Sequence, residues 1–184
     1  MMNIYDFDGT IYDGDSSIDF FKYSLKKHKN LFLLLPGICI AFALYQMKIK
    51  DKPYFKSKFF SIVKKMENLE DDVKCFWEKN NNKIKAFYLE QKKEDDIIIS
   101  ASPEFLLKPI CDELGVNLIA SNFDKKTGKL IGNNCYGDEK VCRLKELGIE
   151  QCDEFYSDSK SDEPMMKIAK KAFLVKKNVI NNWT

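Results

Sequence analysis

The chain contains 184 residues, of which 45% are apolar, 13% aromatic and 32% charged, a composition typical of a folded soluble protein rather than a disordered one. Its 30 basic residues nearly cancel its 28 acidic ones, which leaves a formal net charge of +2, and Arg143 is the only arginine. Because a nucleic-acid groove needs a clustered basic stripe and arginine contacts to bases, these features argue against binding to nucleic acid.

The cysteines and the single histidine narrow the kinds of active site further. Six cysteines are scattered without a C-x-x-C pair, so a zinc-thiolate site is not expected. With an N-terminus that lacks the pattern of a secretory signal, they predict reduced, partly buried thiols in a cytoplasmic protein. The only histidine, His28, lies in a lysine-rich helical stretch, where we expect an exposed side chain. Catalysis is therefore expected to depend on carboxylates.

The first predicted element is a central strand at residues 2–7, an apolar run that ends in an acidic, glycine-containing turn. From residue 15 to residue 91 the apolar residues recur with the i, i+4 spacing of helices. We expect this region, 15–91, to be an all-helical insertion. The core is then formed by residues 1–14 and 92–184.

Strands and helices alternate in the rest of the chain. The predicted elements are a strand at 97–99, a helix capped by Ser102 with Pro103 in its first turn, a strand at 118–120, a hairpin around 125–129, a helix at 138–147, a strand at 154–156, a helix from about 164, a strand at 172–175 and a polar tail. This alternation predicts an α/β fold with a Rossmann-like parallel sheet and helices on both faces. Ligands of such sheets bind beyond the carboxyl ends of the strands.

Two carboxylates follow the first predicted strand. Asp6 and Asp8 are two positions apart in an extended segment, so both side chains can face one pocket. Like charges this close favour a bound cation, and hard oxygen ligands favour Mg²⁺. A second acidic turn, residues 157–162, can close the site from another strand, and the Thr10 hydroxyl can hold a neighbouring carboxylate or backbone group.

This set of groups suits phosphoryl transfer. A carboxylate can attack phosphorus and form an aspartyl-phosphate, which divides the reaction into two steps. A second carboxylic acid can protonate the leaving alkoxide and later deprotonate the attacking water. Magnesium, a lysine and hydroxyl donors can stabilise the charge on the transferring group.

Four motifs resemble those of the haloacid dehalogenase superfamily of phosphatases. They are DFDGT at 6–10, IIIS at 97–100, the lysine of GDEKV at 137–141 and DSKSD at 158–162. The matches appear in order over nearly the whole chain, and each falls at a predicted strand end or helix start. The resemblance implies a Rossmann-like core with an inserted helical cap of the C1 type, as in the phosphoserine-phosphatase-like branch.

The resemblance also implies a role for each motif residue. Asp6 corresponds to the nucleophile and Asp8 to the general acid and base. Ser100 would bind a phosphoryl oxygen, and Lys140 would neutralise the nucleophile and the phosphate. Magnesium would be held by Asp6, Asp158 and the backbone carbonyl of Asp8, while Thr10 and Asp162 would support the site.

Three of these assignments leave alternatives open. Ser102 competes with Ser100 for binding the phosphoryl group. Asp162 suits the N-cap of the following helix as well as the support of the metal shell or of Lys140. Asp15 aligns with an acidic residue that contacts substrate in the phosphoserine-phosphatase-like branch, but it suits the N-cap of the first helix of the cap equally well. The absence of arginine from residues 15–91 argues against phosphoserine as the substrate.

The stretch from Leu31 to Tyr45 contains no charged or strongly polar side chain. It suits a buried helix of the cap, a surface that docks on a bilayer or shelters acyl chains, or a membrane-spanning helix. Together with residues 117–121, 136–141 and 156–164 it resembles phosphatidylglycerophosphatase C-type enzymes. That resemblance implies a lipid phosphate as substrate and a cytoplasmic protein that associates with membranes.

The sequence thus predicts a Mg²⁺-dependent phosphate monoester hydrolase acting through an aspartyl-phosphate, with phosphatidylglycerophosphate as one candidate substrate. The alternatives are a soluble phosphatase of small metabolites, a phosphotransferase and a phospho-accepting signalling module. The helical insertion and the second carboxylate of the first motif disfavour the signalling module, because a receiver keeps its phosphoaspartate and needs no acid or base.

Overall fold

The computed structural model describes residues 2–177 and 179–183, and its centre is a mixed six-stranded sheet in the order β3-β2-β1-β4-β5-β6. Strands β1 to β5 run parallel, whereas β6 is antiparallel to β5. The predicted parallel sheet is therefore confirmed for its first five strands. The bounds are β1 (Asn3–Tyr5), β2 (Ile97–Pro103), β3 (Asn117–Ser121), β4 (Cys152–Ser157), β5 (Ala169–Lys176) and β6 (Val179–Asn182).

The C-terminal segment differs from the predicted polar tail. Strand β5 continues to Lys176, and the chain returns as β6 with Ile180 opposite Val175. All four residues of β6 are exposed, so no alternation of apolar and polar residues marks it in the sequence. The pairing depends on main-chain groups, which form the ladder whatever the side chains are.

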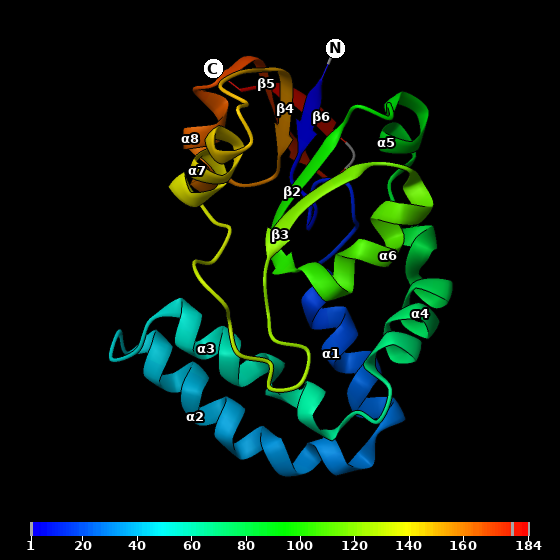
Figure 1. Cartoon of the computed structure of the whole chain (residues 1–184), viewed down its shortest axis with the longest axis vertical. Helices are drawn as coiled ribbons and strands as arrows, with labels where there is room; N and C mark the ends of the chain where they lie inside the picture. Colours follow the sequence, from blue (N-terminus) through cyan, green and yellow to red (C-terminus); the bar gives the residue numbers. More distant parts are fainter. Residues whose placement is uncertain (1, 178, 184) are drawn as a thin grey trace.

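Alternate residues of β2 point to opposite faces of the sheet, and each face has its own apolar core. Ile98 belongs to the cluster that contains Leu107, whereas Ile97 and Ile99 belong to the cluster that contains Leu144. Helices cover both faces, as predicted (Figure 1). One face carries α5 (Ala86–Gln91) and α6 (Glu104–Leu114), and the other carries α7 (Asp138–Glu146) and α8 (Glu163–Met166).

A row of three aromatic rings crosses β1, β4 and β5. Tyr5 lies opposite Tyr156, and Tyr156 lies opposite Phe173, with ring centroids 4.7 Å apart in both pairs. The backbone N–H of Asp6 then donates to the carbonyl of Tyr156 at 2.9 Å. Because stacked cross-strand pairs fix the register of a sheet, they align the carboxyl ends of β1 and β4. Asp6 is thereby placed beside the turn that follows β4.

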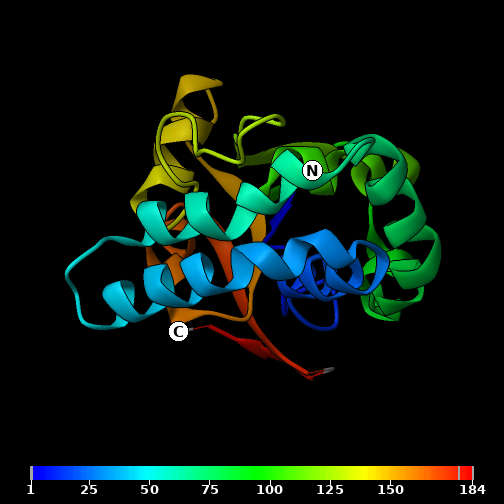
Figure 2. The same cartoon turned by 90° about the horizontal axis from the view of Figure 1, so that it is seen from below.

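Most of the helical segment 15–91 lies beyond the carboxyl ends of the strands, whereas its last helix, α5, packs on one face of the sheet (Figure 1). Side chains of Asp15, Asp51 and Asn68 cap three of its helices by accepting backbone N–H bonds. Figure 2 shows α2 and α3 side by side across its lower surface. Its elements are α1 (Ser16–Lys27), η1 (Lys29–Leu34), α2 (Leu35–Gln46), α3 (Lys52–Phe59), η2 (Phe60–Lys65), α4 (Leu69–Asn80), η3 (Asn81–Lys83) and α5.

The apolar stretch 31–45 forms most of η1 and α2, and much of its surface faces outwards. Leu33 is 79% exposed and Ile40 is 61% exposed, whereas Leu31, Ile38 and Ala41 are buried. The alternative of a fully buried helix is therefore wrong. By length and composition alone, Lys29–Gln46 would be able to cross a membrane. In the structure the inner side of α2 packs on α3.

His28 is not the exposed side chain that the sequence predicts. Its Nε2 atom lies 2.8 Å from the carboxylate of Asp72, and only 22% of the His28 side chain is exposed. Lys27 pairs with the same carboxylate at 2.7 Å. These contacts join α1 to α4 over more than forty positions of sequence, which no local pattern signals.

A long loop, residues 122–134, leaves β3 and runs down to the helical segment (Figure 1). The predicted hairpin at 125–129 is reduced, within the described residues, to an isolated bridge between Phe123 and Leu130. The turn is held by the carboxylate of Asp124, which accepts the backbone N–H of Thr127 at 2.6 Å. The flanking residues leave the sheet instead of pairing along it, so no ladder forms.

The 122–134 loop contacts α3 and η2 closely. The backbone N–H of Leu130 donates to the Ser57 hydroxyl at 3.1 Å, and the rings of Phe123 and Phe60 lie 4.8 Å apart. Gly128 has a φ of +68°, and a Cβ at this position would collide with the main chain of Phe60. The loop thus ties the core to the helical segment.

Candidate active site

The centre of the candidate site is a buried group of two carboxylates and one lysine. Lys140, which is 2% exposed, donates to Asp6 Oδ1 at 2.7 Å and to Asp162 Oδ2 at 2.8 Å. Burial raises the pKa of Asp6 to about 7, although the Lys140 ammonium opposes that change. Burial acts to lower the pKa of Lys140, but the two carboxylates raise it above its usual value. Three residues from three different motifs are thus brought together.

Asp162 occupies the N-cap position of α8 but does not cap it. Its side chain makes no capping hydrogen bond, and its Oδ2 atom accepts from Lys140 and from the Ser157 hydroxyl at 2.8 Å each. Its Oδ1 atom is buried without a partner among the described residues. Of the two alternatives left open by the sequence, the contact with Lys140 is the one that the geometry favours.

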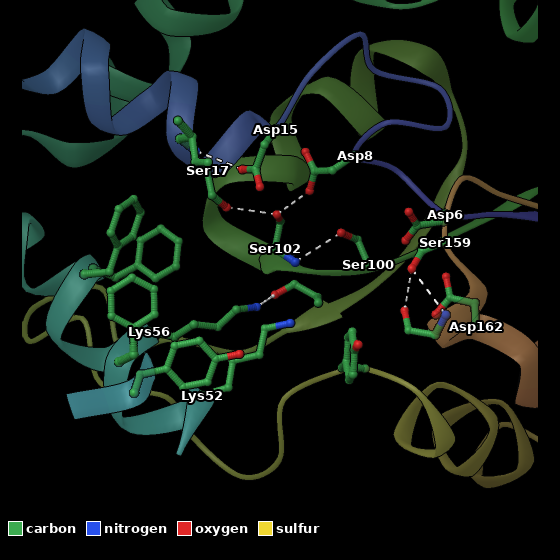
Figure 3. Close-up of a pocket in the computed structure, with 18 of the residues that line it drawn as sticks. Asp6, Asp8, Asp15, Ser17, Lys52, Lys56, Ser100, Ser102, Ser159 and Asp162 are labelled. Carbon is green, nitrogen blue, oxygen red and sulfur yellow. Dashed lines mark hydrogen bonds between the residues drawn. The ribbon is translucent and has the colours of Figure 1, made fainter. Parts of the chain in front are cut away.

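Asp8 is held at the mouth of the same cavity by two donors. Its Oδ1 atom accepts the backbone N–H of Ser16 at 2.6 Å, and its Oδ2 atom accepts the Ser102 hydroxyl at 2.5 Å (Figure 3). Burial raises the pKa of Asp8 to about 6, and the negative charge of Asp15 acts in the same direction. A carboxyl group with this pKa exchanges its proton near neutral pH.

Ser100 and Ser102 both face this cavity from the end of β2 (Figure 3). The Ser100 hydroxyl accepts the backbone N–H of Ser102 at 3.0 Å, and Ser102 also shares a hydrogen bond with Ser17 at 2.9 Å. The predicted helix start is wrong, because β2 continues through Pro103 and α6 has no side-chain cap. The sequence suggested a capping serine, whereas the structure makes Ser102 a partner of Asp8.

Thr10 connects the Asp6 loop with the second acidic turn. Its hydroxyl accepts the backbone N–H of Asp158 at 2.8 Å and lies 3.5 Å from Asp6 Oδ2, to which it donates. The sequence predicted this kind of role for Thr10. Gly9, with a φ of +75°, lies against the Asp158 carboxylate, and a Cβ at Gly9 would collide with it. Lys85, a residue without a sequence signal, donates to the Gly9 carbonyl at 2.5 Å.

The oxygen atoms near Thr10 are of the kind that bind a hard cation such as Mg²⁺. The Asp6 carboxylate accepts from the Thr10 hydroxyl, and the backbone N–H of Asp158 donates to the same hydroxyl. The exposed Asp158 carboxylate lies against Gly9, in the turn that also contains Asp8. Within residues 2–177 and 179–183, no cluster of three or more His, Cys, Asp or Glu side chains is arranged to hold a metal. The candidate set needs only two such side chains, because its third member is the main-chain carbonyl of Asp8.

The cavity between the core and the helical segment has a volume of about 390 Å³. The core contributes Asp6, Asp8, both serines and Lys140, and α1 contributes Asp15, which also caps that helix by accepting the N–H of Ile18 at 2.9 Å. Asp158 is not among the lining residues. The opposite wall is largely aromatic and carries two lysines: Phe42, Tyr45, Lys52, Phe55, Lys56, Phe59 and Phe60.

Lys52, Lys56 and Ser17 are residues of this cavity that the sequence did not predict. Asp51 and Pro53 mark the start of a helix, and the spacing of four places Lys52 and Lys56 on one face of it. The helix and this spacing are visible in the sequence. Nothing in the sequence, however, distinguishes these two lysines from the rest of the 30 basic residues.

A family model described as haloacid dehalogenase-like hydrolase matches residues 4–167. The chain belongs to this family. Membership in the superfamily, predicted from the four motifs, is thereby confirmed, and the protein is a hydrolase. The finer resemblance to phosphatidylglycerophosphatase C-type enzymes stays a prediction.

Individual proteins share only low sequence identity with this chain. A histidinol-phosphatase of Neisseria meningitidis is 28% identical over 89 residues, which is 41% of this chain and 40% of that protein. The chain therefore matches less than half the length of this curated relative. A Bordetella pertussis protein of unknown function has a similar structure, with a TM-score of 0.76, 17% identity and coverage of 93% of this chain and 87% of that one.

A third similar structure is a phosphoserine phosphohydrolase-like protein from Francisella tularensis. Its TM-score is 0.63 at 18% identity, with coverage of 96% of this chain and 88% of that chain. At these identities the two structures establish a shared fold, which confirms the predicted Rossmann-like α/β architecture of this family.

Proposed function

We propose that this hydrolase is a phosphatase that cleaves phosphate monoesters through an aspartyl-phosphate on Asp6. The observation that carries the proposal is the carboxylate of Asp6 at the floor of the cavity, held by the buried ammonium of Lys140, with a second carboxyl group at Asp8 in the same cavity. The phosphatase names of the Neisseria and Francisella proteins support this class of reaction.

Each side chain has a distinct role in this proposal. Asp6 attacks phosphorus, while the Lys140 ammonium favours the ionised form of the attacking carboxylate and orients it. Asp8 gives its proton to the leaving alkoxide and later takes one from water, which its pKa of about 6 permits. Ser100 donates to the phosphoryl group from the end of β2, with Ser102 orienting Asp8. Asp162 fixes Lys140 from the far side.

Magnesium is the proposed cofactor, held by Asp6, Asp158 and the main-chain carbonyl of Asp8. When bound, it would supply positive charge beside the transferring phosphoryl group. Thr10 and Gly9 serve this set indirectly, since one bonds the Asp158 backbone and the other leaves room for the Asp158 carboxylate.

We assign residues 15–91 as a cap on a core made of residues 1–14 and 92–184. The support is that this segment provides the aromatic wall of the cavity and that most of it, apart from α5, lies over the strand ends. Asp15 is both an N-cap and a lining residue, so the two alternatives for it are compatible. The cap would select the substrate, while the core performs the reaction.

The test is a phosphate-release screen with purified protein, Mg²⁺ and a panel of phosphate monoesters. The panel contains phosphatidylglycerophosphate, phosphatidic acid, lysophosphatidic acid, and soluble sugar and amino-acid phosphates. We expect release from at least one compound, loss of release in excess chelator, and recovery on adding Mg²⁺. Full activity in chelator would remove magnesium from the proposal. Transfer of the phosphate to added glycerol instead of water would identify a phosphotransferase.

A lipid phosphate is the second candidate, and the exposed apolar surface of η1 and α2 favours it. Phe32, Leu33 and Ile40 are each more than half exposed, and on the inner side Phe42 and Tyr45 of the same helix line the cavity. A bilayer that covers the outer side would place lipid beside the cavity. A soluble metabolite phosphatase has no use for this surface.

Vesicle sedimentation distinguishes the two candidates. With vesicles of phosphatidylglycerol and phosphatidylcholine, we expect the protein in the pellet and, after detergent, in the supernatant. The double variant Leu33→Ser/Ile40→Ser should remain in the supernatant. The matched control is Leu147→Ser, which removes a leucine that is 63% exposed and follows the end of α7, outside η1 and α2. Wild-type protein that stays in the supernatant would favour the soluble substrate.

A further inference from the structure

Two lysines of α3 project into the cavity from the side opposite the carboxylates (Figure 3). Lys56 donates to the Ala101 carbonyl at 2.6 Å and to Asn134 Oδ1 at 2.8 Å. The ammonium of Lys52 lies 4.0 Å from the centre of the Tyr136 ring. Both lysines therefore bridge α3 to the core, yet every one of these partners is an uncharged group.

Neither ammonium has a carboxylate partner within the described part of the chain. The ion pairs of residues 2–177 and 179–183 include Lys22, Lys27, Lys83 and Lys140, but neither Lys52 nor Lys56. Burial lowers the pKa of Lys56 to about 8, and the positive charge of Lys52 acts in the same direction. Two like charges at a partly buried wall are unfavourable unless an anion offsets them.

The cavity is thus divided by charge. Asp6, Asp8 and Asp162 lie on the core side, where Lys140 already compensates part of their charge. The two cap lysines lie on the other side, next to aromatic rings. A phosphate monoester attacked by Asp6 would leave its alcohol portion facing this second side.

We propose that Lys52 and Lys56 form a subsite for a second anionic group of the substrate. The preferred substrates are then phosphate monoesters that carry another anionic oxygen group, either a phosphodiester or a carboxylate, within the length of the cavity. This inference rests on the proposed phosphatase function and adds the substrate class. Ammonium groups bind either kind of anion, so the choice between the two falls to the experiment.

The experiment compares kcat/KM for three soluble compounds. Glycerol 3-phosphate has only the monoester, 3-phosphoglycerate adds a carboxylate, and glycerophosphoglycerol phosphate adds a phosphodiester. For the wild type we expect one or both of the compounds with a second anionic group to be preferred over glycerol 3-phosphate by at least tenfold. The larger ratio identifies whether the second group is a carboxylate or a phosphodiester. Equal kcat/KM values for all three compounds would overturn the proposal.

Variants test whether the two lysines cause the preference. Lys52→Gln and Lys56→Gln should each lower the ratio by about tenfold, mainly through a higher KM, and Lys56→Arg should restore most of it. Lys58→Gln is the matched control, because Lys58 is exposed on the same helix and does not line this cavity. A loss that is equal for all three compounds would show that the lysines only tether the cap.

Two further readouts keep the proposal falsifiable. Lys56→Gln removes two hydrogen bonds to the core and can therefore destabilise the fold. Lys52→Gln removes only the contact with the Tyr136 ring. If Lys56→Gln fails to fold, the result for Lys52→Gln tests the proposal. Calorimetric titration of the Asp6→Asn protein with each compound tests the subsite without turnover. Lack of phosphate release from any monoester would contradict the proposed function, while lysine-dependent binding of the compounds with a second anionic group would still support the subsite.

Discussion

The two walls of the cavity differ in how their charges are balanced. On the core wall, the ammonium of Lys140 is buried and donates to two carboxylates. On the helical wall, Lys52 and Lys56 contact only uncharged groups. A lysine that is paired with carboxylates holds a reacting group in one geometry. Lysines without a carboxylate partner instead favour a ligand that brings a negative charge. Under the proposed function, this difference assigns the reaction chemistry to the core wall and the selection of substrate to the helical wall.

The largest expected effect comes from removing the nucleophile on the core wall. Asp6→Asn keeps the shape of the side chain but abolishes its nucleophilicity, so we expect turnover to fall by at least about 10⁴-fold with the fold retained. Steady-state phosphate release and circular dichroism check both parts. Asp13→Asn, an exposed change in the same loop, should leave turnover nearly unchanged. Near-normal activity of Asp6→Asn would refute its role.

The next largest effect is expected from removing the buried ammonium of Lys140. Lys140→Met leaves Asp6 and Asp162 buried without their cation, so we expect a loss of about 3–5 kcal/mol in the free energy of unfolding. Activity should fall by about 10²- to 10³-fold, as for other lost charge-stabilising groups. Urea unfolding and kinetics measure the two effects. The matched control is Lys145→Met on the exposed side of the same helix, and similar losses in both variants would contradict the interpretation.

The contact between the 122–134 loop and η2 can be weakened without changing any charged residue of the cavity. Gly128→Ala places a Cβ against the main chain of Phe60, and we expect the free energy of unfolding to fall by about 2–4 kcal/mol. Gly132→Ala has the same backbone strain, with a φ of +69°, but an open surrounding, so about 1 kcal/mol is expected. Equal effects in thermal or urea unfolding would show that the loop does not fasten the cap.

The smallest effect is a pH dependence confined to the helical wall. Burial and the nearby Lys52 charge lower the pKa of Lys56 to about 8, while Asp8 and Asp15 act against them. A lysine is charged below its pKa, so the preference for substrates with a second anionic group should decline as the pH rises through about 8. Lys56→Arg stays charged and should keep the preference at pH 9. A pH profile identical in both proteins would exclude Lys56 as the titrating group.

The core side of the candidate site was predictable because its signals are local. Asp6, Asp8 and Asp158 each follow a strand whose apolar run is visible in the sequence, and strand ends of a parallel sheet converge. Lys140 lies in the first turn of a helix that the sequence also marks. The sequence did not decide between Ser100 and Ser102 as the serine that binds the phosphoryl group. The reason is that the continuation of β2 through Pro103 depends on its pairing with β3.

The helical wall was less predictable because its contacts join distant segments. Lys56 meets Asn134 across 78 positions, and His28 meets Asp72 across 44. The uninterrupted apolar stretch 31–45 indicated an apolar helix but not which side would remain exposed, which depends on how α3 packs against α2. Strand β6 went unnoticed for a related reason, since only its backbone takes part in the sheet.

The most direct measurement is chemical trapping of the residue that carries the phosphate during turnover. Protein quenched in acid while it hydrolyses an accepted monoester is treated with borohydride, which reduces an aspartyl-phosphate to homoserine, and the peptides are sequenced by mass spectrometry. We expect homoserine at position 6 only when substrate was present. Continued phosphate release with Asp6 unmodified, or homoserine at another aspartate, would contradict the nucleophilic role of Asp6.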